Sequence, residues 1–183
     1  DDVLTTTVTA TNGTAVITEA GQILFTPNEN FNGAAEIVLT ITDGLLTTVQ
    51  TIAVTVNPVN DAPVLDTITA VTVNEDDSVF SGTITSSDVD ANATAVYTTT
   101  STVAGFTLNS NGTYTFDAAD VAYQSLAAGV SQIITIPVTV TDDANATDTQ
   151  NLTITITGTN DAPVLNTITA VTVNEDDSVF SGT

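Results

Sequence analysis

The chain has 183 residues, of which 22 are acidic and none is lysine, arginine or histidine, so its formal charge at pH 7 is -22. Phosphate binding needs basic side chains, and this balance therefore excludes a nucleic-acid partner. With 42% hydrophobic residues, the chain has enough apolar side chains to form a core, unlike a disordered acidic tail. It has no run of about 18 apolar residues, so we expect no membrane insertion in this segment.

The lack of histidine and cysteine excludes most nucleophilic catalysis, because Ser-His and Cys-His pairs cannot be built. A pair of carboxylates could do acid-base work, but one small domain with 5% aromatic residues offers little for a substrate pocket. We therefore predict that the chain is not an enzyme. Two carboxylates about 4 Å apart repel by roughly 4 kcal/mol near a surface, so multivalent cations are the expected partner.

Apolar residues alternate with threonine from the start of the chain, which predicts β-strands. In chain order the first expected strands are residues 3–10, 14–18, 21–27, 34–42 and 46–56. Clusters of glycine, asparagine and aspartate separate them, as turns require. Residues 1–59 are interpreted as a partial domain that contains strands C to G of a β-sandwich.

The next hundred residues contain a complete set of strand signals. The expected strands A to G are residues 64–73, 79–86, 95–100, 105–108, 113–116, 132–141 and 149–157. Seven short strands in about 100 residues are typical of an immunoglobulin-like Greek-key sandwich. The only helical candidate is residues 118–128. The fold class predicted is all-β, with tandem sandwich domains in an extended rod and residues 60–159 as the complete domain.

Residues 160–183 repeat residues 60–83 with one substitution, Asn166 for Asp66, at an offset of 100 residues. A repeat at the length of one domain indicates a tandem array. Residues 160–183 are therefore interpreted as strands A and B of a further repeat. Either the chain is a segment of a longer polypeptide, which we prefer, or these strands complete the first domain of the next subunit by strand addition.

The acidic residues gather in loops that the sandwich topology brings to the two ends of the complete domain. The upstream set consists of Glu29, Asn60, Asp61, Asp88, Asp90 and Asp142, and the downstream set consists of Glu75, Asp76, Asn160 and Asp161. Calcium binds 6–8 oxygen ligands, which loops and a linker can supply, whereas magnesium prefers more water. Zinc, copper and iron sites are disfavoured without thiols and imidazoles. For any single aspartate, a solvated surface position remains the alternative.

Several motifs resemble a known family. N-D-A-P linkers, N-E-D between strands A and B, D-V-D between B and C, L-N-S-N-G-T-Y-T-F and T-I-T-G-T-N-D-A-P are similar to VCBS-type repeats, which are bacterial cadherin-like modules. The first domain, with A-T-N-G, F-T-P and N-F-N-G, resembles the related cadherin-like tandem repeat. The resemblance covers essentially the whole chain.

This resemblance implies a spacer segment of a giant RTX-type or biofilm adhesin on the bacterial cell surface, in which calcium ions between domains rigidify the rod. Its partners are then neighbouring repeats of the same polypeptide, with ligand-binding modules elsewhere. The alternative is a subunit of an extracellular filament, joined to the next subunit through the C-terminal A and B strands.

Regular rows of threonine hydroxyls on a strand could also present a surface to ice or sugar, although threonine is simply a good strand former.

Overall fold

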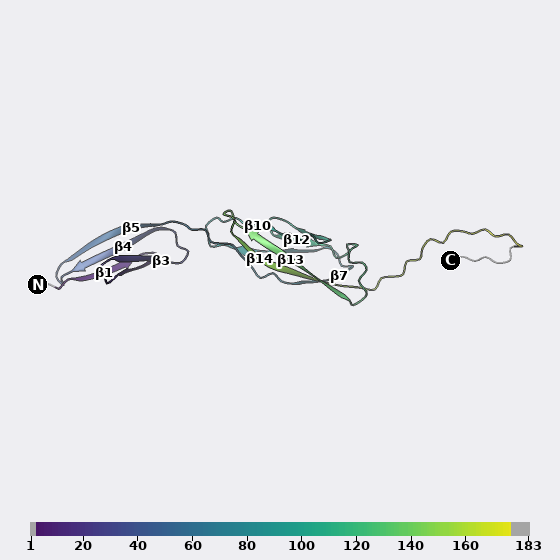
Figure 1. Ribbon diagram of the computed structural model, residues 1–183, viewed down its shortest axis with the longest axis horizontal. Helices are drawn as coiled ribbons and strands as arrows, with labels where there is room; N and C mark the ends of the chain where they lie inside the picture. The colour runs from purple at the N-terminus through teal and green to yellow at the C-terminus, as the bar shows by residue number, and fades with distance from the viewer. Residues whose placement is uncertain (1–2, 177–183) are drawn as a thin grey trace.

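The structure is a computed structural model that describes residues 3–176, and across them the chain forms strands and no helix. Two β-sandwich domains lie end to end, and residues 160–176 run away from the second domain (Figure 1). The all-β class predicted from the sequence is confirmed. No helix in residues 3–176 could span a membrane.

The first domain is a small, incompletely covered sandwich. Its sheet has the order β1 (Thr5–Ala10), β4 (Gly33–Thr42), β5 (Thr47–Val56), and β2 (Gly13–Ile17) forms a hairpin with β3 (Ile23–Pro27). These are the five strands expected before residue 57. Ala35 and Ile37 on β4 are buried, but Ile41 and Ile52 are each 36% exposed. The apolar interior of this domain is thus open on one side in the described chain.

The second domain contains two facing sheets and a short strand pair. One sheet has the order β10 (Val96–Thr98), β13 (Ser131–Thr141), β14 (Thr147–Thr157), β7 (Val71–Asn74), and the other has the order β11 (Phe106–Leu108), β12 (Thr113–Phe116), β8 (Phe80–Thr83). The pair consists of β6 (Val64–Leu65) and β9 (Ser86–Ser87). All of these neighbours are antiparallel except β7 and β14, which are parallel.

The core of the second domain follows from the alternation of its long strands. Ile136 and Val138 on β13, and Leu152 and Ile154 on β14, have no exposed surface, and Phe116 on β12 packs in the same buried cluster. The intervening threonines face outward, because successive side chains of a strand point to opposite faces. Each fully buried side chain contributes about 1.5–3 kcal/mol, so this face holds the domain together.

Two expectations for the second domain were wrong. The single strand A expected at 64–73 is two strands, because β6 pairs with β9 whereas β7 crosses to the other sheet and pairs with β14. Residues 118–128 form consecutive turns, such as Tyr123 N–H to Asp120 O at 3.0 Å, and no helix. Tyr123 is buried against Phe116, with ring centroids 5.5 Å apart, so the core holds this segment in turns.

The C-terminal segment has the sequence of strand A but forms no strand among residues 160–176. Leu165 is 83% exposed and Val173 is 55% exposed, whereas their counterparts Leu65 and Val73 are 3% and 7% exposed. Strand formation here depends on neighbouring strands, which Leu65 and Val73 have. The strand B expected at the end of the chain begins beyond residue 176 and lies outside the described residues.

Candidate metal centres

The downstream acidic cluster is built on the turn that ends β7. Asp77 N–H donates to Asn74 O at 3.1 Å, and Asn74 N–H donates to the Asp77 carboxylate at 2.7 Å. The backbone bond closes a β-turn, and the Asp77 carboxylate holds the first residue of the same turn. Glu75 and Asp76 occupy the two central positions of this turn.

Glu75 is a fully buried carboxylate, with 0% of its surface exposed. Its N–H donates to Thr157 O at 3.1 Å, and its Oε1 accepts the Thr159 N–H at 2.6 Å. Its other oxygen, Oε2, is buried and has no hydrogen-bond partner. Because a buried polar atom without a partner is costly, Oε2 marks a place where an external donor or ion would be stabilising.

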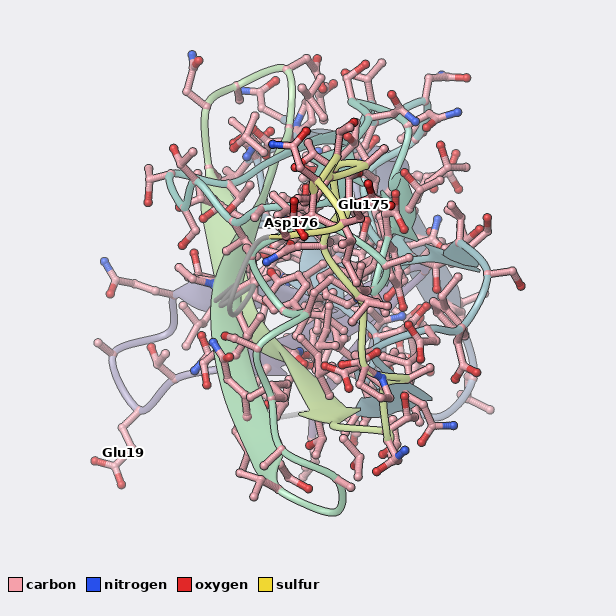
Figure 2. The ribbon with its side chains drawn as sticks, turned by 90° about the vertical axis from the view of Figure 1, so that its right-hand side faces the viewer. Glu19, Glu175 and Asp176 are labelled. Atoms are coloured by element: carbon pink, nitrogen blue, oxygen red, sulfur yellow. The ribbon has the colours of Figure 1, made fainter. Side chains whose placement is uncertain are left out.

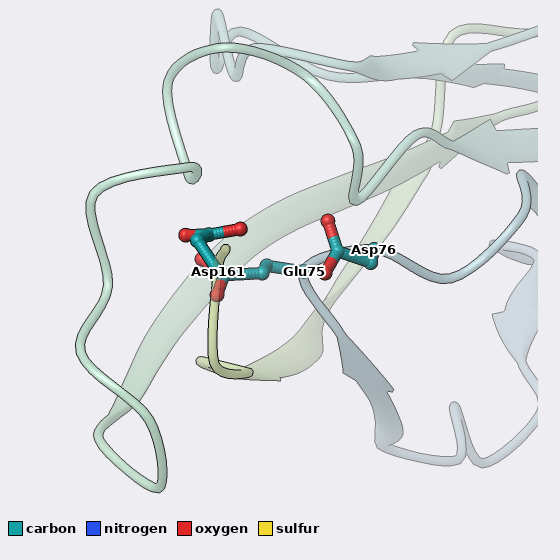
Figure 3. Close-up of side chains that lie close together, drawn as sticks. All are labelled: Glu75, Asp76 and Asp161. Atoms are coloured by element: carbon teal, nitrogen blue, oxygen red, sulfur yellow. The ribbon is translucent and has the colours of Figure 1, made fainter. Parts of the chain in front are cut away.

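Glu75, Asp76 and Asp161 each offer a carboxylate oxygen within 4.8 Å of the others, and Asp76 and Asp161 are exposed. Figure 3 shows the three side chains gathered between the end of β7 and the segment that follows β14. The Thr159 hydroxyl donates to Asp76 Oδ2 at 2.5 Å. Asn160 lies beside the cluster and donates to Asp161 O at 3.2 Å.

The repeated sequence provides an internal comparison for this cluster. Glu175 and Asp176, which occupy the same positions in the C-terminal copy, are both exposed (Figure 2). The N-E-D sequence alone therefore does not bury the glutamate. Burial of Glu75 requires β14 and Thr159 beside it.

The upstream cluster fastens the linker to the second domain. Asn60 Nδ2 donates to Asp142 Oδ2 at 2.8 Å, and the Asp61 N–H donates to Asp90 Oδ2 at 2.8 Å. Asp142, which is 6% exposed, also accepts the Ala146 N–H at 2.7 Å. Donation from Asn60 is the main cause that lowers the pKa of Asp142, and burial opposes it. Asp142 is therefore held ionised at the junction.

Asp88 is the second carboxylate with an unsatisfied oxygen. Its Oδ1 accepts the Asp90 N–H at 2.9 Å, whereas its Oδ2 is buried without a partner. Glu75 Oε2 and Asp88 Oδ2 are the only buried side-chain oxygen or nitrogen atoms without a partner in residues 3–176. They belong to opposite ends of the second domain, one in each of the two predicted sets.

The junction between the domains contains a cavity of about 410 Å³. It is lined by Asn32 of the first domain, by Pro58 to Asn60 of the linker and by Asp90 and Asp143 of the second. Glu29 lies in the exposed turn after β3 and does not line it. No three carboxylates approach within 4.8 Å at this junction in the described residues.

The structure thus brings together most of the predicted ligands, but not all. Glu75, Asp76 and Asp161 form one cluster with Asn160 beside it, and Asn60, Asp61, Asp88, Asp90 and Asp142 are linked by hydrogen bonds at the other end. Glu29 stays apart from both. The sequence reasoning missed Thr159, which has no charge to mark it, and the role of Asp148, whose carboxylate accepts the Leu65 N–H at 2.8 Å and holds β6.

The donors of both clusters fit a hard cation. Every charged donor is a carboxylate, and calcium favours such oxygens in sites of irregular geometry. The described chain has no basic side chain that could satisfy Glu75 Oε2 or Asp88 Oδ2 instead. Backbone carbonyls and water would complete the coordination, as they do in calcium sites generally.

The fold is a cadherin-like, immunoglobulin-type β-sandwich, and the comparisons with known proteins agree with it. Residues 60–155 match the family described as bacterial Ig domain, and residues 1–57 match the cadherin-like domain. The chain belongs to the bacterial Ig domain family. No curated protein sequence matches the chain.

Three solved structures illustrate the similarity of fold. Human protocadherin-24 EC1-2 has a TM-score of 0.54 at 17% identity, over 88% of this chain and 84% of that one. Drosophila N-cadherin EC1-4 has a TM-score of 0.53 at 14% identity, over 88% of this chain and 44% of that one. Protocadherin gamma B7 domains 1-4 have a TM-score of 0.56 at 16% identity, over 85% of this chain and 41% of that one. This chain spans less than half of the last two.

These similarities define the general kind of molecule. Cadherin-like and bacterial Ig domains are typically extracellular, non-enzymatic modules that occur in tandem, and cadherin-like domains commonly bind calcium. At identities of 14–17%, the structural matches carry the fold alone.

Proposed function

We propose that this chain is a structural spacer segment of a bacterial cell-surface adhesin, made of VCBS-type repeats and rigidified by calcium between its domains. The observation that carries the proposal is the pair of buried, unpartnered carboxylate oxygens, Glu75 Oε2 and Asp88 Oδ2, one at each end of the second domain. An acidic chain without basic residues can satisfy them only with an external cation or water.

Calcium would act on the upstream junction through residues of both the linker and the second domain. Asp61, Asp88, Asp90 and Asp142 would supply carboxylate oxygens, with Asn60 beside them, and Glu29 of the first domain would have to move towards them to take part. A bound ion restricts bending because it fixes the linker against the loops of the domain it enters. A stiff array holds ligand-binding modules, located elsewhere, away from the cell, which would serve adhesion and biofilm formation of the RTX type.

Small-angle scattering of the full chain, with calcium and with excess chelator, tests this proposal. We expect the largest dimension of the particle to increase and its flexibility to decrease when calcium is added. Asp88→Ala with Asp90→Ala should remove this response. Glu19→Gln with Glu36→Gln removes two exposed carboxylates of the first domain and should leave it intact. A scattering profile that is identical in calcium and chelator would refute calcium rigidification.

The alternative of a filament subunit, joined by donor-strand complementation, is not favoured. Of the proposed donor strands A and B, only strand A falls within the described residues, and it forms no strand in the single chain, as both functions allow. Neither matched family favours such assembly over a tandem array. A filament subunit would form concentration-dependent fibres, and sedimentation velocity of the purified chain distinguishes the two functions.

A further inference from the structure

Five asparagines of the chain stand two positions before a threonine, in the acceptor sequence for N-linked glycosylation. They are Asn12, Asn92, Asn111, Asn145 and Asn151. A threonine-rich chain contains this tripeptide readily by chance, so the tripeptide alone does not identify an acceptor. The structure separates the five asparagines by their position, by the hydrogen bonds of their side chains and by the charge beside them.

Two of the five asparagines lie in turns at the upstream end of the second domain. Asn145 is in the hairpin between β13 and β14, where its N–H donates to Asp142 O at 3.3 Å. Asn92 is in the loop between β9 and β10, in a turn closed by the Ala93 N–H and Asp90 O at 3.4 Å. The two asparagines share a left-handed backbone, with φ of 69° for Asn145 and 66° for Asn92, and both are exposed.

The side-chain amides of these two asparagines are free. Neither Asn92 nor Asn145 makes a side-chain hydrogen bond to any residue of the described chain. By contrast, Asn12 Nδ2 donates to Ala34 O at 3.1 Å. Because the amide nitrogen is the atom that receives the sugar, Asn92 and Asn145 can enter a transferase without losing a hydrogen bond, whereas Asn12 cannot.

The other two acceptor sequences are held by the fold. Asn111 Oδ1 accepts both the N–H and the hydroxyl of Thr113, at 3.1 and 2.7 Å, so the asparagine and the threonine of this sequence are bound to each other. Asn151 lies within β14 opposite Pro137, and the next residue, Leu152, is fully buried. A transferase would have to pull the strand out of its sheet to reach Asn151.

The two free asparagines also share a charged neighbour. Each stands in the pentapeptide D-A-N-A-T, at residues 90–94 and 143–147, with an aspartate two positions before the asparagine. The other three acceptor sequences have Ala10, Asn109 and Thr149 at that position. A carboxylate there allows a basic pocket of a transferase to form a charge-assisted hydrogen bond beside the acceptor. The flanking alanines leave the asparagine side chain sterically open.

We infer that Asn145 and Asn92 are acceptor sites for an N-linked glycan, which an external transferase takes from a glycosyl pyrophosphate. In the transfer, a bond forms between the asparagine Nδ2 and the anomeric carbon of the sugar, and the bond from that carbon to the pyrophosphate oxygen breaks. The pyrophosphate leaves with the electron pair, and one amide proton passes to a base of the transferase. Encounter with an exported transferase rests on the proposed cell-surface location, but the acceptor geometry does not.

Asn145 should be the better acceptor of the two. Asp143, two positions before it, is exposed, and the one hydrogen bond of its carboxylate in the described chain is long, at 3.5 Å. The Asp90 carboxylate is half-buried and accepts the Asp61 N–H of the linker at 2.8 Å. A transferase that binds the carboxylate must therefore compete with the linker at Asn92 but not at Asn145.

Both acceptor loops border the cavity between the domains. Asp90, Ala91, Ala93 and Asp143 all line it. Glycans on the asparagines of these loops would occupy space beside the cavity and limit how closely the two domains can approach each other. This effect is steric and needs no cation.

Glycosylation of the folded, full chain in solution tests the inference. The chain is incubated with a purified bacterial oligosaccharyl transferase and a lipid-pyrophosphate-linked oligosaccharide, and mass spectrometry measures the occupancy of all five asparagines. We expect glycans at Asn145 and Asn92, with Asn145 modified first, and none at Asn12, Asn111 or Asn151. A chain that gains no glycan, or gains it equally at the asparagines without an aspartate, would overturn the inference.

Two variants and a control separate the role of the carboxylate from that of the loop. Asn145→Gln should lose one glycan mass and retain the second. Asp143→Asn keeps the size of the side chain but removes its charge, and it should lose most of the modification at Asn145 while Asn92 in the same molecule keeps its own. Glu19→Gln removes an exposed carboxylate far from both loops and should change neither site. Full occupancy of Asn145 in Asp143→Asn would refute recognition through the carboxylate.

This experiment can fail independently of the scattering experiment. If Asn145 is glycosylated while the scattering profile of the unmodified chain is identical in calcium and chelator, the acceptor sites stand and calcium rigidification is refuted. If calcium stiffens the chain but no asparagine gains a glycan, the spacer function stands and the acceptor sites are refuted.

Discussion

Replacement of Glu75 by glutamine should change the stability of the second domain in opposite directions with and without calcium. Without a cation, Glu75 faces two carboxylates within 4.8 Å. Each repels it by about 1 kcal/mol if water screens the pair and by about 3 kcal/mol at an effective dielectric near 20. Glutamine removes this repulsion but still accepts the Thr159 N–H through its carbonyl oxygen. Because Asp76 and Asp161 are exposed, the screened value applies to both pairs, and in chelator we therefore expect the variant to be more stable than the wild type, by about 2 kcal/mol.

With calcium the order should be reversed. When the free calcium concentration is 100 times the dissociation constant, binding stabilises the native state by about 2.7 kcal/mol. For a domain of this size, 1 kcal/mol corresponds to roughly 4–8 °C, so the melting temperature of the wild type should rise by about 10–20 °C. The variant lacks the buried ligand and should gain little. Extracellular calcium sites have dissociation constants of about 0.1–1 mM, so a titration to tens of millimolar covers the range.

Tyrosine fluorescence can follow this change in one domain alone. The chain has three tyrosines and no tryptophan, and Tyr97, Tyr114 and Tyr123 all lie in the second domain. Melting curves of the full chain should thus report residues 60–159 without interference from the first domain. Glu175→Gln is the matched control, with an unchanged curve in both conditions. If Glu75→Gln lowers the melting temperature equally in calcium and in chelator, Glu75 has a purely structural role and our reasoning is wrong.

Four further substitutions test other contacts. Asn60→Ala should raise the pKa of Asp142 towards its ordinary value of 3.8. A lowered carboxyl pKa stabilises the fold above the ordinary pKa, and this stabilisation is lost as the pH falls through the lowered pKa, so wild type and variant should converge in stability at low pH. NMR titration and urea melts at pH 3 and 7 check this. Gly112→Ala should destabilise by more than about 1 kcal/mol, because φ is 85° and the new Cβ lies 2.3 Å from Ile84 O. Leu152→Ala, at a position with 0% exposure, should lower the free energy of unfolding by about 2–5 kcal/mol, as measured by urea unfolding. Ile52→Ala, at the equivalent but open position of the first domain, should lower it clearly less, as measured by circular dichroism.

The strands that the sequence predicted best are those whose alternation is strict. Residues 132–141 and 149–157 were expected as strands, and β13 and β14 include them both with one or two additional residues. The break between β6 and β7 was missed because an alternating pattern records which face is buried and not which sheet a strand joins. The parallel pairing of β7 with β14 likewise depends on tertiary structure, and no pattern in the local sequence indicates it.

The acidic residues of the site could be grouped by end, because sandwich topology sends alternate loops to opposite ends. Their individual environments could not be predicted. Glu75 and Glu175 have the same neighbours in sequence, but one is buried and the other exposed. Glu29 was placed with the upstream set because of its loop, yet contact across a linker depends on the angle between domains, which loop position does not determine.

The absence of basic residues makes it simple to identify the buried carboxylate oxygens that have no partner in the chain. Because the chain contains no lysine, arginine or histidine, each buried carboxylate oxygen must be satisfied by a backbone N–H, an amide, a hydroxyl, water or an external cation. Asp142 and Asp90 obtain their donors from Asn60, Asp61 and Ala146. Glu75 Oε2 and Asp88 Oδ2 obtain none. The domain thus satisfies its other buried carboxylate oxygens internally but leaves one open at each end, and these two oxygens are the observation on which the proposed calcium sites rest.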